Sequence, residues 1–187
     1  LLRQGIATSM GVEALQIPMF GLYGACSTSG EALALASMSA AAGYGGTMIA
    51  VTSSHFGSAE KEFRFPLGYA NQRPLSSHWT VTGSGAFLVQ SAEEYRKQNT
   101  KSYFSNIRIT GVTVGKIVDY GLKDSQNMGA CMAPAAMDTI VQNFQDMERK
   151  EKDYDRIITG DLGSVGQKLL FELLDENHKD IKKNHMD

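Results

Sequence analysis

The sequence predicts a single α/β domain over residues 1–187, and three stretches carry that prediction. An apolar run at residues 17–23 passes through a corner of small residues into an Ala- and Leu-rich run, which indicates a strand, a sharp turn and a helix. Residues 47–52 are a continuous apolar run, typical of a strand that is buried on both faces. Residues 154–159 again place a buried strand before a glycine-rich turn and a helix. Strands that alternate with helices favour an α/β architecture.

The first elements follow from periodicity and composition. Residues 1–15 carry apolar side chains about four positions apart, which predicts a helix. Residues 17–23 form the predicted strand, with Pro18 at its beginning, where proline is tolerated. Residues 32–42 are almost entirely small or apolar, and a helix that is apolar all round is expected to be buried.

Cys26 lies at the corner between this strand and this helix. The start of a helix has unpaired N–H groups and the positive end of the helix dipole, so a cysteine there is biased towards the nucleophilic thiolate. Ser27, Thr28 and Ser29 can each cap the helix. Cysteine is also commonly buried as a small hydrophobe. The corner therefore indicates either a reactive thiol or simple packing.

His55 follows the strand at residues 47–52. Strand, helix and strand in this order form a right-handed crossover, and sites in such sheets lie at the carboxyl ends of the strands. Cys26 and His55 are therefore expected to face one crevice. His55 could pair with Cys26, contact an acidic ligand, or only cap its own loop.

Arg64 lies between two phenylalanines in a long irregular stretch, residues 56–77. Loops of this length are often functional, and a guanidinium fork beside flat apolar rings suits a planar carboxylate. The alternative is a solvated basic loop that packs its aromatic side chains.

The second half of the chain is expected to continue with strands and helices. Residues 91–102 are charged and predict a solvated connection, and residues 177–187 are polar and predict a frayed end. The strands are expected at residues 79–90, 106–118 and 154–159, and the helices at residues 130–150 and 165–174. Between the last strand and helix, residues 160–166 could bind an anion on their backbone N–H groups. This turn lacks the G-x-G-x-x-G fingerprint, so no nucleotide is predicted.

Composition narrows the class of protein. The net charge of −2 gives no reason to expect nucleic acid as a partner, and no apolar run approaches the ~20 residues of a spanning helix. The two cysteines, Cys26 and Cys131, predict reduced thiols in a cytosol-like compartment, with Cys131 packed among methionine and alanine. Scattered histidines predict no metal site, and no cofactor is expected. The chain has no initiator methionine, and we expect it to be a fragment of a longer protein.

The corner at residues 23–29, the glycine-rich run at residues 80–89 and the strand end at residues 155–161 resemble the thiolase-like superfamily, which includes ketoacyl synthases and thiolases. The resemblance implies a layered α/β/α fold with a mixed sheet and a buried central helix, of which this chain holds a part. It also implies a homodimer.

A closer similarity is to the stage V sporulation protein AD family of spore-forming bacteria. It is carried by blocks spread in order along the chain, at residues 23–29, 52–55, 63–66, 80–86, 132–136 and 159–162. The similarity implies a protein that binds dipicolinic acid and takes part in its uptake into the developing spore. It further implies contacts with other proteins of the dipicolinate channel, in the cytoplasm or peripherally at the inner spore membrane.

The chain departs from the condensing enzymes at one position. Those enzymes place a catalytic histidine directly after the strand that corresponds to residues 154–159, whereas this chain has Gly160 and Asp161. An ionised aspartate would repel an enolate rather than stabilise it, so the enzyme hypothesis is weakened.

Three functional hypotheses follow. In the first, dipicolinate lies beside Cys26, the helix start at Ser27 binds one carboxylate, His55 or Arg64 binds the other, and Asp161 orients a donor. The second is a thioester-dependent acyltransferase with Cys26 as the nucleophile. The third is a structural partner in a membrane assembly.

Overall fold

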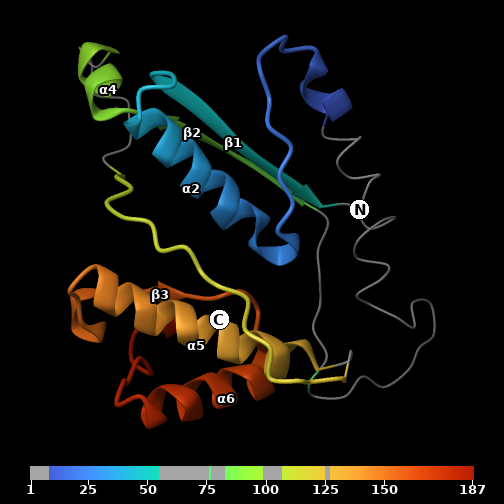
Figure 1. Ribbon diagram of the computed structural model, residues 1–187, viewed down its shortest axis with the longest axis vertical. Helices are drawn as coiled ribbons and strands as arrows, with labels where there is room; N and C mark the ends of the chain where they lie inside the picture. Colours follow the sequence, from blue (N-terminus) through green and yellow to red (C-terminus); the bar gives the residue numbers. More distant parts are fainter. Residues whose placement is uncertain (1–8, 55–75, 77–82, 99–106, 125–126) are drawn as a thin grey trace. The chain divides into compact units, whose positions relative to one another are not determined.

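The computed structural model describes residues 9–54, 76, 83–98, 107–124 and 127–187. The chain divides into two compact units (Figure 1). Unit 1 comprises residues 1–67 and 80–110, and unit 2 comprises residues 68–79 and 111–187. Each unit is described by itself. The structure is mixed α/β, as predicted, whereas the thiolase-like layering and the single domain stay predictions.

Unit 1 is built from one helix on a two-stranded sheet. Strands β1 (Thr47–Ser54) and β2 (Gly83–Gln90) pair antiparallel, with Thr47 opposite Gln90 and Ser54 opposite Gly83. Helix α2 (Thr28–Ala41) lies along this sheet (Figure 1). The remaining elements are a 3-10 turn η1 (Ala25–Ser27) and a short helix α4 (Ala92–Gln98).

Small residues let helix α2 approach the sheet closely. Ala32 and Ala36 are four positions apart, so they share one face of the helix, and they pack against Ala50 of β1. Leu35 and Met38, on other faces of α2, are exposed. The prediction of a helix buried all round is therefore wrong for the described residues, because they cover only one face of α2.

Two further predictions for unit 1 need correction. Residues 17–23 form no strand. The partner of β1 is the antiparallel β2, so the predicted parallel crossover is absent from the described residues. An apolar run becomes a strand only where a neighbouring strand offers hydrogen bonds. The charged stretch predicted as a solvated connection contains helix α4. It is supported by an ion pair between Glu93 and Lys97, one helical turn apart.

Unit 2 is a pair of helices with a two-residue parallel ladder. Helices α5 (Met128–Asp146) and α6 (Gly163–Glu176) confirm the predicted helices. They cross where Gly129 meets Gly166. A Cβ atom added to Gly129 would lie 2.3 Å from the carbonyl oxygen of Leu162, so only glycine fits there. Strands β3 (Ile157–Ile158) and β4 (His185–Met186) pair in parallel, and a 3-10 turn η3 (Glu151–Asp153) precedes β3.

The core of unit 2 consists of large side chains that are almost fully buried. They come from α5, α6 and the two segments that follow these helices, and include Phe144, Leu162, Leu170, Leu174 and Ile181. Helices α5 and α6 each carry an apolar stripe, and the two stripes face each other.

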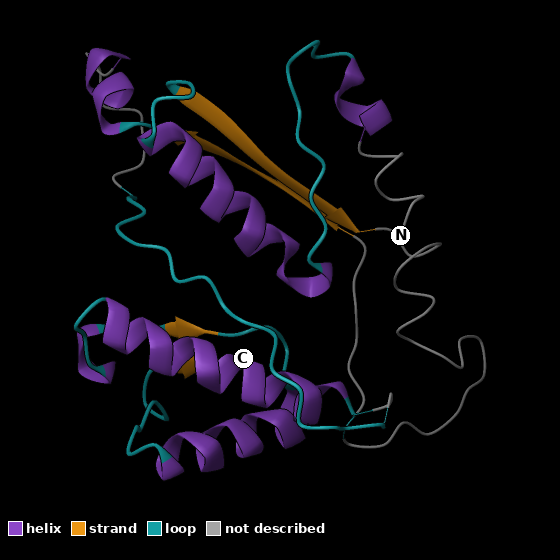
Figure 2. Ribbon diagram, in the orientation of Figure 1, coloured by secondary structure: helices purple, strands orange, loops and turns teal. Residues whose placement is uncertain are grey.

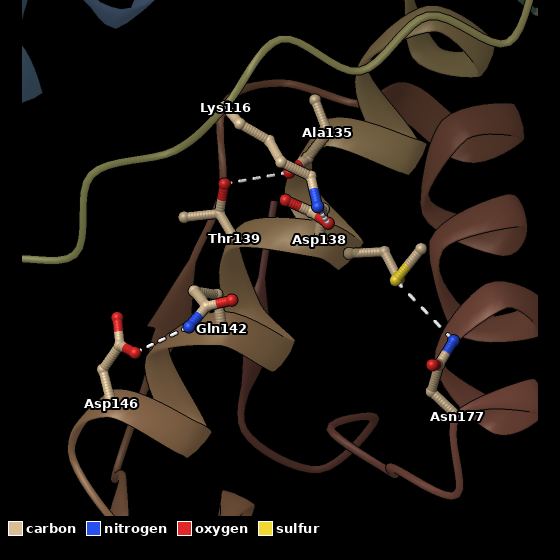
Figure 3. A network of polar contacts seen from close by, with 8 residues as sticks. Lys116, Ala135, Asp138, Thr139, Gln142, Asp146 and Asn177 are labelled. Atoms are coloured by element: carbon tan, nitrogen blue, oxygen red, sulfur yellow. Dashed lines mark hydrogen bonds and ion pairs between the residues drawn. The ribbon is translucent and has the colours of Figure 1, made fainter.

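The polar side of α5 makes its own contacts, which Figure 3 shows. Lys116 Nζ lies 2.8 Å from Asp138 Oδ1, and this ion pair holds residues 111–124 against the helix. The hydroxyl group of Thr139 donates to the carbonyl oxygen of Ala135 at 3.0 Å. Only the ion pair involves residues 111–124, which are drawn as loop throughout in Figure 2. The Thr139 bond lies within α5.

Three predictions for the second half of the chain are wrong. The buried strand predicted at residues 154–159 is reduced to the two residues of β3, and Ile158 is 70% exposed. A strand was predicted at residues 106–118, but residues 107–118, the described part of this stretch, form none. Residues 177–187 do not fray, because Ile181 is 1% exposed and the amide nitrogen of Asn184 donates to the carbonyl oxygens of Glu151 and Tyr154. These bonds tie the last segment to the turn before β3.

Candidate binding site at the turn before helix α2

The turn at residues 24–28 has a strained backbone. Ala25 has φ +49°, in the left-handed region that alanine rarely adopts, and Ser27 N–H donates to the carbonyl oxygen of Gly24 at 2.9 Å. Strain of this kind is often found at functional positions. The turn is tight as well as strained. A Cβ atom on Gly24 would lie 2.7 Å from Ser27 Oγ and 2.8 Å from Glu31 Oε2.

Cys26 lies in this turn directly before helix α2, and its side chain is exposed and reduced. The prediction of a cysteine at the start of a helix is confirmed. The prediction of a preceding strand is not, so the turn joins a loop to a helix. Exposure removes the alternative that Cys26 is a buried packing residue within the described part of the chain.

Ser27 is the N-cap residue of α2, but its side chain does not cap the helix. Its hydroxyl group donates to the carbonyl oxygen of Gly24 at 2.6 Å, and the Thr28 hydroxyl donates to the carbonyl oxygen of Ala25 at 2.7 Å. Both hydroxyls therefore stabilise the turn that precedes the helix. Ser27 gives α2 no side-chain cap, and the N–H group of Thr28 already donates to the carbonyl oxygen of Ala25. An anion at this helix start would therefore bind the N–H groups that follow Thr28.

Glu31, in the first turn of helix α2, lies against Gly24 of the turn at residues 24–28. Its Oε2 atom is buried and accepts no hydrogen bond from the described residues. A buried carboxylate oxygen without a partner is costly, although the positive end of the helix dipole offsets part of that cost. Sequence reasoning missed this atom. The sequence signal for its burial was a glycine seven residues before Glu31, since Gly24 leaves room for the carboxylate.

The other predicted site residues lie outside the described part of unit 1. His55 and Arg64 lie outside the described residues. Asp161 lies in unit 2, where its Oδ1 atom accepts a hydrogen bond from the N–H group of Gly163 at 3.1 Å. Asp161 thus closes the loop that leads into α6, the common role of an aspartate at a turn.

The predicted anion-binding turn at residues 160–166 is occupied by the chain itself. The N–H group of Leu162 donates to Asp187 Oδ1 at 2.6 Å, and Asp161 holds the next N–H group. The chemistry predicted for these N–H groups is correct, since they bind carboxylates. The prediction of an open site for an external anion is wrong, because Asp161 and Asp187 supply the carboxylates.

His185 lies beside this turn and was not singled out by the sequence. Its Nε2 atom is 3.0 Å from Thr159 Oγ1, and its Nδ1 atom is 3.3 Å from Gln167 Nε2. The edge of the ring meets Phe171. Burial lowers the pKa of His185, and the nearby carboxylate of Asp187 raises it by a smaller amount. The contacts with Thr159, Gln167 and Phe171 hold the ring in place as a structural group.

In the part of the chain that the structure describes, no three His, Cys, Asp or Glu side chains are grouped as a metal ion would need. None of the helices in that part is both long and apolar enough to cross a membrane. Cys131, expected to be packed, is exposed.

The fold and the turn define the class of protein: a mixed α/β protein with an exposed thiol at the start of a helix. The family model of stage V sporulation protein AD (SpoVAD) matches residues 1–187. Stage V sporulation protein AD from Bacillus subtilis (strain 168) is 40% identical over 187 residues, which are 100% of this chain and 52% of that protein. The chain therefore belongs to the stage V sporulation protein AD family, a family of sporulation proteins, and spans about half the length of its curated relative.

Proposed function

We propose that the protein binds dipicolinic acid and takes part in its uptake into the developing spore, on a thiolase-like scaffold without condensing activity. Family membership supports a role in sporulation. The resemblance to the family described above supplies dipicolinate as the ligand. The observation that carries the proposal is the exposed, strained turn at Cys26, which leads into a helix start that Ser27 leaves without a side-chain cap.

This turn has suitable chemistry for one carboxylate of the ligand. N–H groups at a helix start, together with the helix dipole, favour an anion, and the Cys26 thiol borders the same turn. Glu31 places a negative charge in the first turn of α2, so the helix start alone gives a dianion little net attraction. The proposal therefore assigns the second carboxylate to a cationic side chain, His55 or Arg64.

The rival function is an acyltransferase that uses Cys26 as its nucleophile. The exposure of Cys26, next to the strained Ala25, favours it, because nucleophiles are often held on sharp turns before helices. Condensation also needs donors that stabilise the developing oxyanion. Asp161, at the expected histidine position, is bound to the N–H group of Gly163, and His185 is bound by Thr159 and Gln167. These bonds count against the rival function.

Calorimetric titration of the protein with dipicolinic acid tests the proposal. We expect saturable binding that weakens roughly five- to tenfold in Cys26→Ala, equivalent to about 1–1.4 kcal/mol. Cys131→Ala is the matched control, because this second exposed cysteine lies on α5 in unit 2, and it should bind as the wild type does. Unchanged binding in Cys26→Ala would exclude the turn as the site.

Acetyl-CoA separates the two functions. The binding function predicts no covalent change, whereas the acyltransferase predicts an acetyl group on the Cys26 sulfur, detected by mass spectrometry of the intact protein. Acetylation of the wild type, absent in Cys26→Ala and retained in Cys131→Ala, would replace the binding proposal with the acyltransferase.

The proposal includes partners and location. It places the protein in the cytoplasm or at the inner spore membrane, as a homodimer that contacts other proteins of the dipicolinate channel. Light scattering of the purified protein measures the dimer. Fractionation of sporulating cells, with and without a high-salt wash, measures peripheral attachment. A monomer in light scattering would exclude the homodimer. Absence of the protein from the membrane fraction before the high-salt wash would exclude peripheral attachment.

A further inference from the structure

We propose that unit 2 carries a separate binding site for a small planar carboxylate, in a cavity beside α5. The cavity has a volume of about 290 Å³ and lies between α5, residues 154–157 and Thr113. Small-molecule pockets begin at about 300 Å³, so this cavity suits a ligand with a single ring. All of its lining residues belong to unit 2.

The wall of the cavity is fixed by hydrogen bonds. Asn143 Nδ2 donates to Thr113 Oγ1 at 2.8 Å, and the hydroxyl group of Tyr154 donates to Asn143 Oδ1 at 2.6 Å. These two hydrogen bonds join Asn143 of α5 to Thr113, before the helix, and to Tyr154, after it. A wall held in this way needs little reordering when a ligand binds, which lowers the entropic cost of binding.

Aromatic and aliphatic side chains give the cavity an apolar surface. The rings of Phe144 and Tyr154 lie 5.8 Å apart between centroids, with their planes inclined by 42°. Ile157 adds an aliphatic side chain to the lining. A planar ring packs favourably on such a surface.

The charge of the cavity is positive. Arg156 lines it, and its Nη1 atom donates to the backbone carbonyl oxygen of Asp155 at 3.2 Å. The guanidinium carbon of Arg149 lies 5.6 Å from the centre of the Tyr154 ring. No acidic side chain lines the cavity, and no ion pair involves either arginine among the described residues. A guanidinium group beside an aromatic wall matches a planar carboxylate in both shape and charge.

This site goes beyond the function proposed for the Cys26 turn, since it uses different residues in the other unit. Benzoate is the probe, because it has one ring and one carboxylate. We expect saturable benzoate binding by calorimetry, weakened roughly tenfold in Arg156→Gln and less in Arg156→Lys, which keeps the charge and loses the fork. Arg96→Gln, on the exposed surface of α4, is the matched control and should leave binding unchanged.

Each outcome decides the inference. Loss of benzoate binding in Arg156→Gln, with Arg96→Gln and Cys26→Ala unaffected, supports the site. Absence of saturable benzoate binding by the wild type overturns it, and so does equal binding in Arg156→Gln. Loss in Cys26→Ala would assign benzoate to the α2 turn and also overturn it. Dipicolinate binding that depends on Cys26, together with no saturable benzoate binding, would leave the proposed function standing while this site fails.

Discussion

Units 1 and 2 bury their apolar residues in different ways. In unit 2, Leu170 and Leu174 of α6 are 0% and 1% exposed, and they lie in a core with Phe144 and Ile181. In unit 1, the buried residues of α2 and β1 are alanines, while Leu35 of α2 is 40% exposed. Large side chains bury more apolar area, and burial contributes roughly 25 cal/mol per Å².

The difference follows from the pattern of each helix. Helix α6 has one apolar stripe and α5 supplies a matching one, so two neighbouring helices bury each other's apolar faces. Helix α2 is apolar on every side, and the β1–β2 sheet covers only the face of Ala32 and Ala36 among the described residues. The exposed Cys26 turn belongs to unit 1, which has the smaller core. Unit 2 has a core of large side chains. Four substitution experiments test this contrast.

The largest effect is expected from Leu170→Ala, in the centre of the unit 2 core. Removing a fully buried leucine should lower the free energy of unfolding by about 2–5 kcal/mol, from lost burial and the cavity left behind. Leu35→Ala on the exposed side of α2 is the matched control and should cost less than about 1 kcal/mol. Urea unfolding followed by circular dichroism measures both. Equal losses would contradict the contrast between the units.

Gly129→Ala should be next in size. The added Cβ would lie 2.3 Å from the carbonyl oxygen of Leu162, so α5 and α6 must separate. Such overpacking costs about 1–3 kcal/mol. Gly30→Ala in α2 meets no atom within 4 Å and should be neutral or stabilising by up to about 1 kcal/mol. The same unfolding measurement compares them, and a stable Gly129→Ala variant would show that the crossing tolerates a wider separation.

Asn184→Ala is expected to have a moderate effect. It leaves the carbonyl oxygens of Glu151 and Tyr154 without their donor, which should lower the free energy of unfolding by about 1–2 kcal/mol. Asn177→Ala is the control, because the hydrogen bonds of the Asn177 side-chain amide are exposed to solvent. Hydrogen exchange of residues 177–187 reports the loss directly. Unchanged protection there would mean that Ile181, the β3–β4 ladder and the Asp187 bond hold the segment without the Asn184 bonds.

The smallest effect concerns pH and His185. Burial lowers the pKa of His185 below its usual value of 6.5, so the unfolded chain binds a proton more readily than the folded one. Stability should be complete above pH 6.5 and should fall as the pH is lowered from 6.5 towards the depressed pKa. Urea midpoints on either side of pH 6.5 measure this. His185→Gln should flatten the dependence between those two pH values, and an unchanged slope would assign it to other groups.

Local patterns predicted several elements of the chain correctly. The apolar stripe of Met137, Ile140 and Phe144 predicted α5, and the apolar run at residues 47–52 predicted β1. A helix and a strand each have a short repeat, so a few residues suffice to reveal them. Cys26 was placed correctly for the same reason, since the capping residues beside it mark the start of a helix.

Errors arose where an element needs a distant partner. Residues 17–23 and 107–118 have the composition of strands, but the described structure gives them no ladder. Residues 177–187 look polar and free, yet Ile181, Asn184 and Asp187 reach back to α6 and to the turn before β3. Composition carries no record of which segment will supply the hydrogen bonds or the burial.

By itself, the sequence determined the helices with clear stripes, the strand β1 and the position of Cys26 at the start of a helix. These depend on neighbours within a few residues. Only the tertiary structure decided that β1 pairs with β2, that Asp161 and Asp187 fill the glycine-rich turn, and that Glu31 lies buried behind Gly24. Each of these contacts joins groups that come together only when the backbone turns between them. The contact therefore contributes to stability only in the folded chain.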